Sequence, residues 1–267
     1  MTVKTLTMLT IAATVGIGLI AVPAQVLHNA RAHEWRQLPP EAIVYNAGNR
    51  AAQTPQTQHT DGALGPTDEV VLYVHADLKR TDFIQPLVCA LRRVLVAPVH
   101  VADIDLPLGS DLMSTPTQFD VGAVTSRLIA ATEAEGGAHT FKYLLHPYDM
   151  KDGQFRYVFA TSYANAAAPY HVGIVSMARL DVNDANRTRA ELAQITAGRA
   201  YKLILKSVAQ LAGLPDTGGC ILAFSRTLED LDGKPAEFCP ADREALVAAR
   251  VLKAEESGGC MYVSERR

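Results

Sequence analysis

The sequence predicts an α/β (α+β) fold with a core of mostly one sheet. Short runs rich in β-branched residues alternate with segments whose apolar residues recur at helical spacing. The resulting order, β-α-β-α-β-β-β-α, favours an α/β arrangement. The chain has 267 residues, of which 48% are hydrophobic and 20% charged, which suits one globular domain with a sizeable core plus appendages.

The strands are expected where apolar runs are short. Three are predicted at residues 70–74, 98–104 and 141–145, and two further segments, 155–163 and 171–180, are predicted to pair as neighbours. A first helix starts at Thr81-Asp82, a second spans residues 119–131, and a third spans residues 186–213. The apolar face of the first helix consists of Phe83, Leu87, Leu91 and Val94.

The third helix carries the most informative pattern. Its apolar face consists of Ala200, Leu203, Ile204, Val208 and Leu211. Gly213 is predicted to end the helix, with Pro215 just beyond. Lys206 and Gln210 lie four residues apart, so their side chains share a face. Two histidines at this spacing, with a glutamate between them, bind the metal in zincins.

On these residues the chain resembles the archaemetzincins, metzincin-type zinc peptidases with the pattern H-E-x-x-H-x-x-G-x-x-H. With Gly213 as the common glycine, the two helix histidines correspond to Lys206 and Gln210. The glutamate corresponds to Ser207 and the third histidine to Asp216. The resemblance continues through Cys220, Ile221-Leu222, Phe224-Ser225, Leu228, Asp232, Lys234 and Phe238-Cys239-Pro240, and covers residues 70–242.

The resemblance implies a zincin/metzincin-like fold. A mixed sheet with two helices would precede the motif helix, and an irregular C-terminal subdomain would follow it. Residues 172–180 resemble the family strand that forms the substrate-binding edge. An extended peptide is therefore expected to add to the sheet near Val172–Met177 by main-chain hydrogen bonds.

The chemistry of a zinc peptidase is missing from the motif positions. A catalytic zinc needs three protein ligands with lone pairs, but charged Lys206 has none to offer and Gln210 is a poor ligand. Ser207 cannot act as the general base near neutral pH. Since no histidine follows His171, no register shift supplies a substitute. The sequence thus predicts a pseudopeptidase without catalytic residues, metal or zinc cofactor that binds or scaffolds a peptide or protein.

One alternative to that prediction stays open: an active zinc metallopeptidase, or another hydrolase, with a non-standard site. His75, His146 and His171 would form a new metal site if the ends of their strands converged. As nucleophiles, Ser207 and Ser225 have no histidine nearby in the sequence, although a catalytic triad need not be local.

The resemblance also implies a pairing of cysteines. In the family four cysteines hold a second, structural zinc, and only Cys220 and Cys239 remain here. Two thiolates make a weak zinc site, so a Cys220–Cys239 disulfide around eighteen intervening residues is expected. Cys260 is the rival partner for either cysteine. Cys89 is expected to be a small core residue on a helix.

The N-terminus predicts export. Lys4 precedes an apolar run, and residues 1–24 read as a signal peptide or, through residues 5–22, as a membrane anchor. Residues 25–69 read as a flexible tether, 70–250 as the domain and 251–267 as a tail. A periplasmic or secreted location follows, with membrane contact only through an uncleaved N-terminus. The 25 basic and 28 acidic residues are dispersed, which does not indicate a nucleic acid partner.

Overall fold

The structure is a computed structural model that describes residues 65–135, 137, 139–153, 155–165, 170–215 and 218–256. The predicted signal peptide or anchor, most of the tether, Asp216 and Cys260 lie outside the described residues. The fold is α/β with a mixed sheet, as the sequence predicts.

A five-stranded sheet forms the centre of the domain, in the order β2-β1-β5-β8-β7. These strands are β1 (Glu69–His75), β2 (Val99–Ile104), β5 (Thr140–His146), β7 (Ala160–Asn165) and β8 (Tyr170–Ser176). The first four in spatial order run parallel, and β7 runs antiparallel to β8. Every residue of β5 is buried, because a central parallel strand is covered on both faces.

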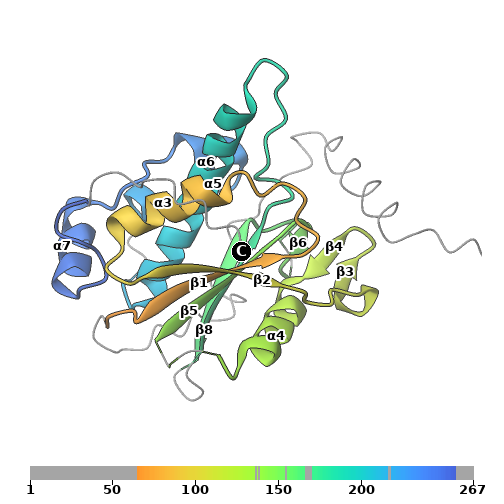
Figure 1. Cartoon of the computed structure of the whole chain (residues 1–267), viewed down its shortest axis with the longest axis horizontal. Helices are drawn as coiled ribbons and strands as arrows, with labels where there is room; N and C mark the ends of the chain where they lie inside the picture. Colours follow the sequence, from red (N-terminus) through yellow and green to blue (C-terminus); the bar gives the residue numbers. More distant parts are fainter. Residues whose placement is uncertain are drawn as a thin grey trace, which may run out of the picture. The chain divides into compact units, whose positions relative to one another are not determined.

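Helices cover both faces of this sheet (Figure 1). Helices α3 (Ile84–Val94) and α5 (Arg189–Leu211) pack on one face, and α4 (Val121–Thr132) packs on the other. Side chains of a strand alternate between faces, so Leu72 points towards α3 and α5 whereas Tyr73 lies on the α4 side. Two hydrophobic clusters result, one on each face of the sheet, and they pack the sheet against its helices.

A second, three-stranded sheet was missed by the sequence analysis. It consists of β3 (Met113–Thr115), β4 (Gln118–Asp120) and β6 (Met150–Lys151), preceded by a 3-10 turn, η4 (Ser110–Leu112). The predicted helix at residues 119–131 therefore begins later, at Val121. Asp120 fixes that start because its side chain accepts a hydrogen bond from the Ala123 amide.

The position of the free sheet edge corrects one prediction. β8 contains Val172, and it lies between β5 and β7, so both of its sides are paired. No peptide can add to Val172–Met177 without displacing a strand. The edge on this side of the sheet is β7, which pairs only with β8 among the described strands.

The segment after α5 is only partly irregular. It contains the 3-10 turn η5 (Cys220–Leu222), α6 (Leu228–Gly233) and α7 (Pro240–Ala248). Residues 251–253, which the sequence places in the tail, run antiparallel to residues 94–96, with a bridge between Leu95 and Leu252. Within the described residues, no helix has the length and apolar character needed to cross a membrane.

Candidate functional site

The motif helix α5 has well-defined ends. Thr188 and Glu191 form a reciprocal capping box at its start. At its end Gly213 has a φ of 104°, which favours glycine. The Gly213 amide donates to Gln210 O at 3.0 Å, and the Leu214 amide donates to Ala209 O at 2.9 Å. This is a Schellman motif, so Gly213 ends the helix as the sequence predicts.

Lys206 makes contacts within the fold itself. Its Nζ donates to the main-chain oxygen of Leu222 at 2.5 Å and lies 6.0 Å from the centre of the Phe224 ring. Leu222 belongs to η5, which follows the motif helix in the chain. The ammonium therefore joins α5 to this turn, at the position that the resemblance aligns with the first motif histidine.

Ser207 points into the protein and is buried. Its Oγ accepts a hydrogen bond of 3.0 Å from the hydroxyl of Tyr143 on β5. Burial raises the pKa of the Tyr143 phenol, so this group stays protonated and donates near neutral pH. Tyr143 lies against Gly173 on β8, where a Cβ atom would come within 2.3 Å of the ring. The residue that the resemblance aligns with the motif glutamate is thus part of a packed interior.

The donor set at the motif does not fit a zinc ion. Lys206 brings a positive charge, Ser207 is hydrogen-bonded inside the core, and Gln210 is half-buried one turn further on. Asp216 lies outside the described residues, and a single carboxylate does not hold zinc in any case. Within the described part of the chain, no group of three or more histidine, cysteine, aspartate or glutamate side chains could hold a metal ion.

Two lysines bind three consecutive carbonyls of the segment after α5. Lys234 is buried, and its Nζ donates to Ile221 O at 3.1 Å and to Ala223 O at 3.2 Å. Lys206 donates to the carbonyl between them, that of Leu222. Charged donors make the stronger class of hydrogen bond, so these contacts stabilise a turn with little secondary structure of its own.

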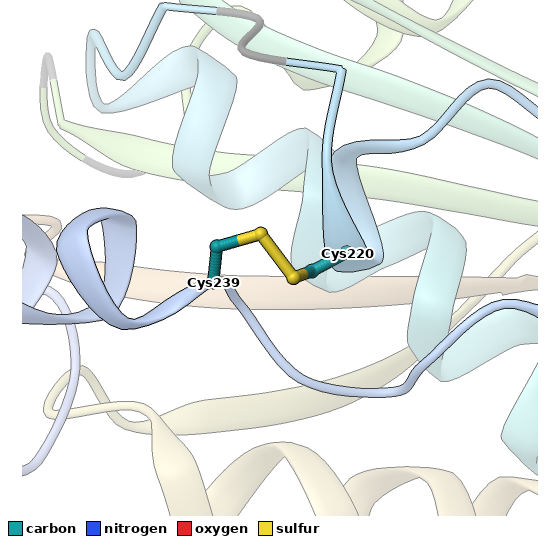
Figure 2. The surroundings of a disulfide bond; sticks show 2 residues. All are labelled: Cys220 and Cys239. Carbon is teal, nitrogen blue, oxygen red and sulfur yellow. A yellow bond between two sulfur atoms is a disulfide. The ribbon is translucent and has the colours of Figure 1, made fainter.

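A disulfide joins Cys220 and Cys239, as the sequence predicts (Figure 2). Their Cα atoms lie 5.3 Å apart. Chain-entropy models give a stabilisation of roughly 3 kcal/mol for a loop of this size. The bond connects η5 to the start of α7, so it closes the segment that the two lysines also hold.

Cys89 departs from its predicted role. It is half-buried on α3 and is itself disulfide-bonded, so the description as a simple core residue is wrong. Helical spacing could not show this, because a thiol on an apolar face looks the same whether or not it is paired. Cys260, the rival partner of the sequence analysis, lies outside the described residues.

The alternative metal site of three histidines does not form. His75 and His146 end the neighbouring strands β1 and β5, at their carboxyl ends. His171 pairs with Phe141 near the start of β5 and stacks on that ring at 4.8 Å. It therefore lies at the opposite end of the sheet. The strand ends do not converge, because parallel neighbours place corresponding residues at the same level.

Ser225 offers no better nucleophile. Its Oγ is buried and has no hydrogen-bond partner within the described residues. A serine nucleophile needs an adjacent base. The described residues therefore offer neither a group of three side chains that could hold a metal nor a nucleophile–base pair at the motif.

One buried ion pair near the carboxyl end of β8 was missed by the sequence analysis. Arg179 donates from Nε and Nη2 to the two carboxylate oxygens of Asp149 at 2.8 and 2.7 Å, and its guanidinium stacks on Tyr157 at 3.9 Å. Gln118 also donates to Asp149, at 2.9 Å. The partners are thirty residues apart, so no local pattern connects them.

Comparison with known proteins places the fold. No family model and no curated protein sequence matches the chain. Three solved structures have a similar fold. A zinc-dependent peptidase from Methanocorpusculum labreanum is 21% identical, over 66% of this chain and 99% of that one, with a TM-score of 0.52. The archaemetzincin from Methanopyrus kandleri is 19% identical, over 68% and 94%, with a TM-score of 0.52.

The third structure is the archaemetzincin from Archaeoglobus fulgidus, at 17% identity, 66% and 99% coverage and a TM-score of 0.48. The two structures with the higher scores carry the conclusion. The chain has an archaemetzincin-like fold, as the resemblance in the motif region implies.

Proposed function

We propose that this chain is a catalytically inactive archaemetzincin-like protein, exported from the cell, that binds an extended peptide or protein segment. The observation that carries the proposal is the state of the motif helix. Lys206 and Ser207 replace a ligand and the base, and both are hydrogen-bonded to other parts of the fold. Both side chains therefore stabilise the fold itself, and neither provides a metal ligand or a general base.

Export is supported by the redox state of the cysteines. Cys220 and Cys239 form a disulfide, and Cys89 is also disulfide-bonded. Such bonds persist in oxidising compartments and are rare in the cytosol of mesophiles. The apolar run near Lys4 supports the same conclusion.

The proposed binding element is the edge strand β7. The Ser176 amide donates to Phe159 O at 2.9 Å, so main-chain groups of alternate residues from Phe159 point towards β8. Those of Ala160, Ser162 and Ala164 point away from the sheet. A peptide can add there by the same ladder of bonds that joins β7 to β8.

We expect Ser162→Pro to weaken binding of an extended peptide by about tenfold or more. Proline removes an outward N–H but leaves the bonds to β8 intact, and edge strands tolerate it. The measurement is the affinity for the tightest peptide selected from a displayed library. Val101→Pro is the matched control, because β2 is the opposite edge and Val101 also points its main chain outward. Equal affinity in the Ser162 variant and the wild type would refute the role of β7.

Two measurements separate this function from that of an active peptidase. The first is the metal content of protein purified without chelator, and the second is cleavage of a peptide library. We expect neither stoichiometric zinc nor proteolysis. Stoichiometric zinc together with chelator-sensitive cleavage would establish the alternative, a zinc metallopeptidase with a non-standard site.

A restored motif tests the geometry of the helix. We expect a variant with Lys206→His, Ser207→Glu, Gln210→His and Asp216→His to bind zinc measurably, because Gly213 still ends the helix as in the family. Tyr143→Phe is added to make room for the glutamate, since the Tyr143 hydroxyl lies 3.0 Å from Ser207 Oγ. Calorimetric titration with zinc measures the result.

The control for this variant keeps Gln210 and carries the other changes. With one helix ligand fewer it should bind zinc at least tenfold more weakly. If the complete variant folds and its affinity does not exceed that of the control, the inferred ligand geometry is wrong.

A further inference from the structure

A second polar cluster lies away from the motif helix, on the α4 side of the sheet. His75 ends β1 and His146 ends β5, and the pairing of Val74 with Leu145 places the two imidazoles side by side. His75 is 4% exposed and His146 is 0% exposed. Two buried histidines without an evident structural need call for a physical explanation.

Both imidazoles are held by the main chain of the loop that follows them. The Asp77 amide donates to His75 Nδ1 at 3.1 Å, and the Tyr148 amide donates to His146 Nδ1 at 3.3 Å. The opposite nitrogen, Nε2, lies 2.8 Å from Leu106 O in His75 and 3.2 Å from the Met150 sulfur in His146. Because Nδ1 of His146 accepts and the ring is buried, this imidazole is neutral with its proton on Nε2.

Tyr148 connects the two loops. Its ring centre lies 5.7 Å from that of His75 and 6.0 Å from that of His146. Its hydroxyl donates to the carboxylate of Asp77. The loop after β1 and the loop after β5 are therefore held together by one set of contacts, in which each histidine accepts a main-chain hydrogen bond at Nδ1.

The charged groups around His146 do not favour its protonation. Burial, and to a smaller extent the neighbouring His75, lowers the pKa of His146 to about 3. Asp77 is 49% exposed and lies 4.0 Å from the other imidazole, that of His75. Asp149 is bonded to Arg179. No carboxylate within the described residues forms an ion pair with His146.

We propose that His75, Asp77, His146 and Tyr148 form an acid-sensitive switch that holds the loops after β1 and β5 closed at neutral pH and releases them in acid. Protonation places a hydrogen on His146 Nδ1, which then cannot accept from the Tyr148 amide. The new cation is also buried without a partner. Both effects are relieved when the loop containing Tyr148 moves into water.

The stability of the closed loop depends on pH because the pKa of His146 differs between the closed and the opened state. In an opened loop His146 takes up a proton near its ordinary pKa of about 6.5, whereas in the closed state its pKa is depressed. The closed state is therefore fully favoured above about pH 6.5 and loses stability as the pH falls towards about 3. Between about pH 7 and about pH 4.5 the opening constant should rise roughly a hundredfold.

Hydrogen exchange of individual amides in the whole protein tests the switch. The protection factor, which corrects for the intrinsic pH dependence of exchange, should fall roughly a hundredfold at Tyr148 between about pH 7 and about pH 4.5. Protection at Leu72, inside β1, should fall much less. An equal fall at both amides would mean global unfolding and would refute the local switch.

His146→Asn provides the decisive variant. The asparagine oxygen can still accept from the Tyr148 amide but does not titrate, so protection at Tyr148 should vary less than about threefold over the same range. His139→Asn, at an exposed histidine, should behave as the wild type. A full acid response in His146→Asn, or none in the wild type, would overturn the proposal. Should the variant fold poorly, NMR titration of His146 in the wild type decides, since an ordinary pKa there excludes the switch.

Discussion

Replacing Arg179 with methionine is expected to lower the free energy of unfolding by about 3–5 kcal/mol. The substitution leaves the Asp149 carboxylate buried without its counterion, with side-chain exposures of 10% for Arg179 and 5% for Asp149 in the intact pair. It also removes the stacking of the guanidinium on Tyr157. Chemical denaturation near neutral pH measures the change.

The control is the same substitution in an exposed ion pair. Arg187 pairs with Asp184 at 3.1 Å, with exposures of 50% and 37%, so Arg187→Met should change stability by less than about 1 kcal/mol. A double variant, Arg179→Met with Asp149→Leu, should recover much of the loss, because it removes the uncompensated charge. If both substitutions lower the free energy of unfolding equally, the buried ion pair contributes no more to stability than the exposed one.

Gly173→Ala is expected to destabilise the protein by about 3 kcal/mol or more, at the upper end of the cost of overpacking. The new Cβ atom would meet two ring atoms of Tyr143 at 2.3 Å, and Tyr143 is fully buried between β1 and β8. The backbone of a central strand cannot move away without breaking its ladder. Thermal or denaturant unfolding measures the effect.

The matching control is Gly198→Ala in α5, where the added Cβ would meet nothing within 4 Å apart from adjacent residues and the backbone of its own helix. There alanine should stabilise the helix by about 0.5–1 kcal/mol. Combining Gly173→Ala with Tyr143→Leu should relieve the clash and restore part of the stability. If the double variant is no more stable than Gly173→Ala alone, the clash with Tyr143 is not the cause.

Local patterns in the sequence predicted the regular elements near their observed positions. The helix predicted over residues 186–213 is α5, and Gly213 ends it by the backbone conformation that glycine favours. The strands predicted at 70–74 and 141–145 are β1 and β5. Strands of two or three residues, such as β6, have too few residues to show a period, so the small sheet was missed.

Local sequence patterns could not predict contacts between residues that are far apart in the chain. The sequence placed the free edge at Val172–Met177, but β8 is covered by β7, which precedes it in the chain. The order of strands in a sheet depends on which faces and edges the helices cover, and no local periodicity records that. The positions of His171 and Arg179 relative to their partners were unpredictable for the same reason.

The sequence by itself determined which chemical groups stand at the motif: lysine, serine and glutamine occupy the positions that the resemblance aligns with the ligands and base of a zinc peptidase, and Cys220 and Cys239 are left to pair. Residue identity alone decides whether a side chain has a lone pair for a metal. Only the tertiary structure decided which contacts Lys206 and Ser207 make. Lys206 binds the carbonyl of Leu222, and Ser207 accepts a hydrogen bond from the Tyr143 hydroxyl, because folding turns η5 back onto α5 and brings β5, from much earlier in the chain, against the same helix.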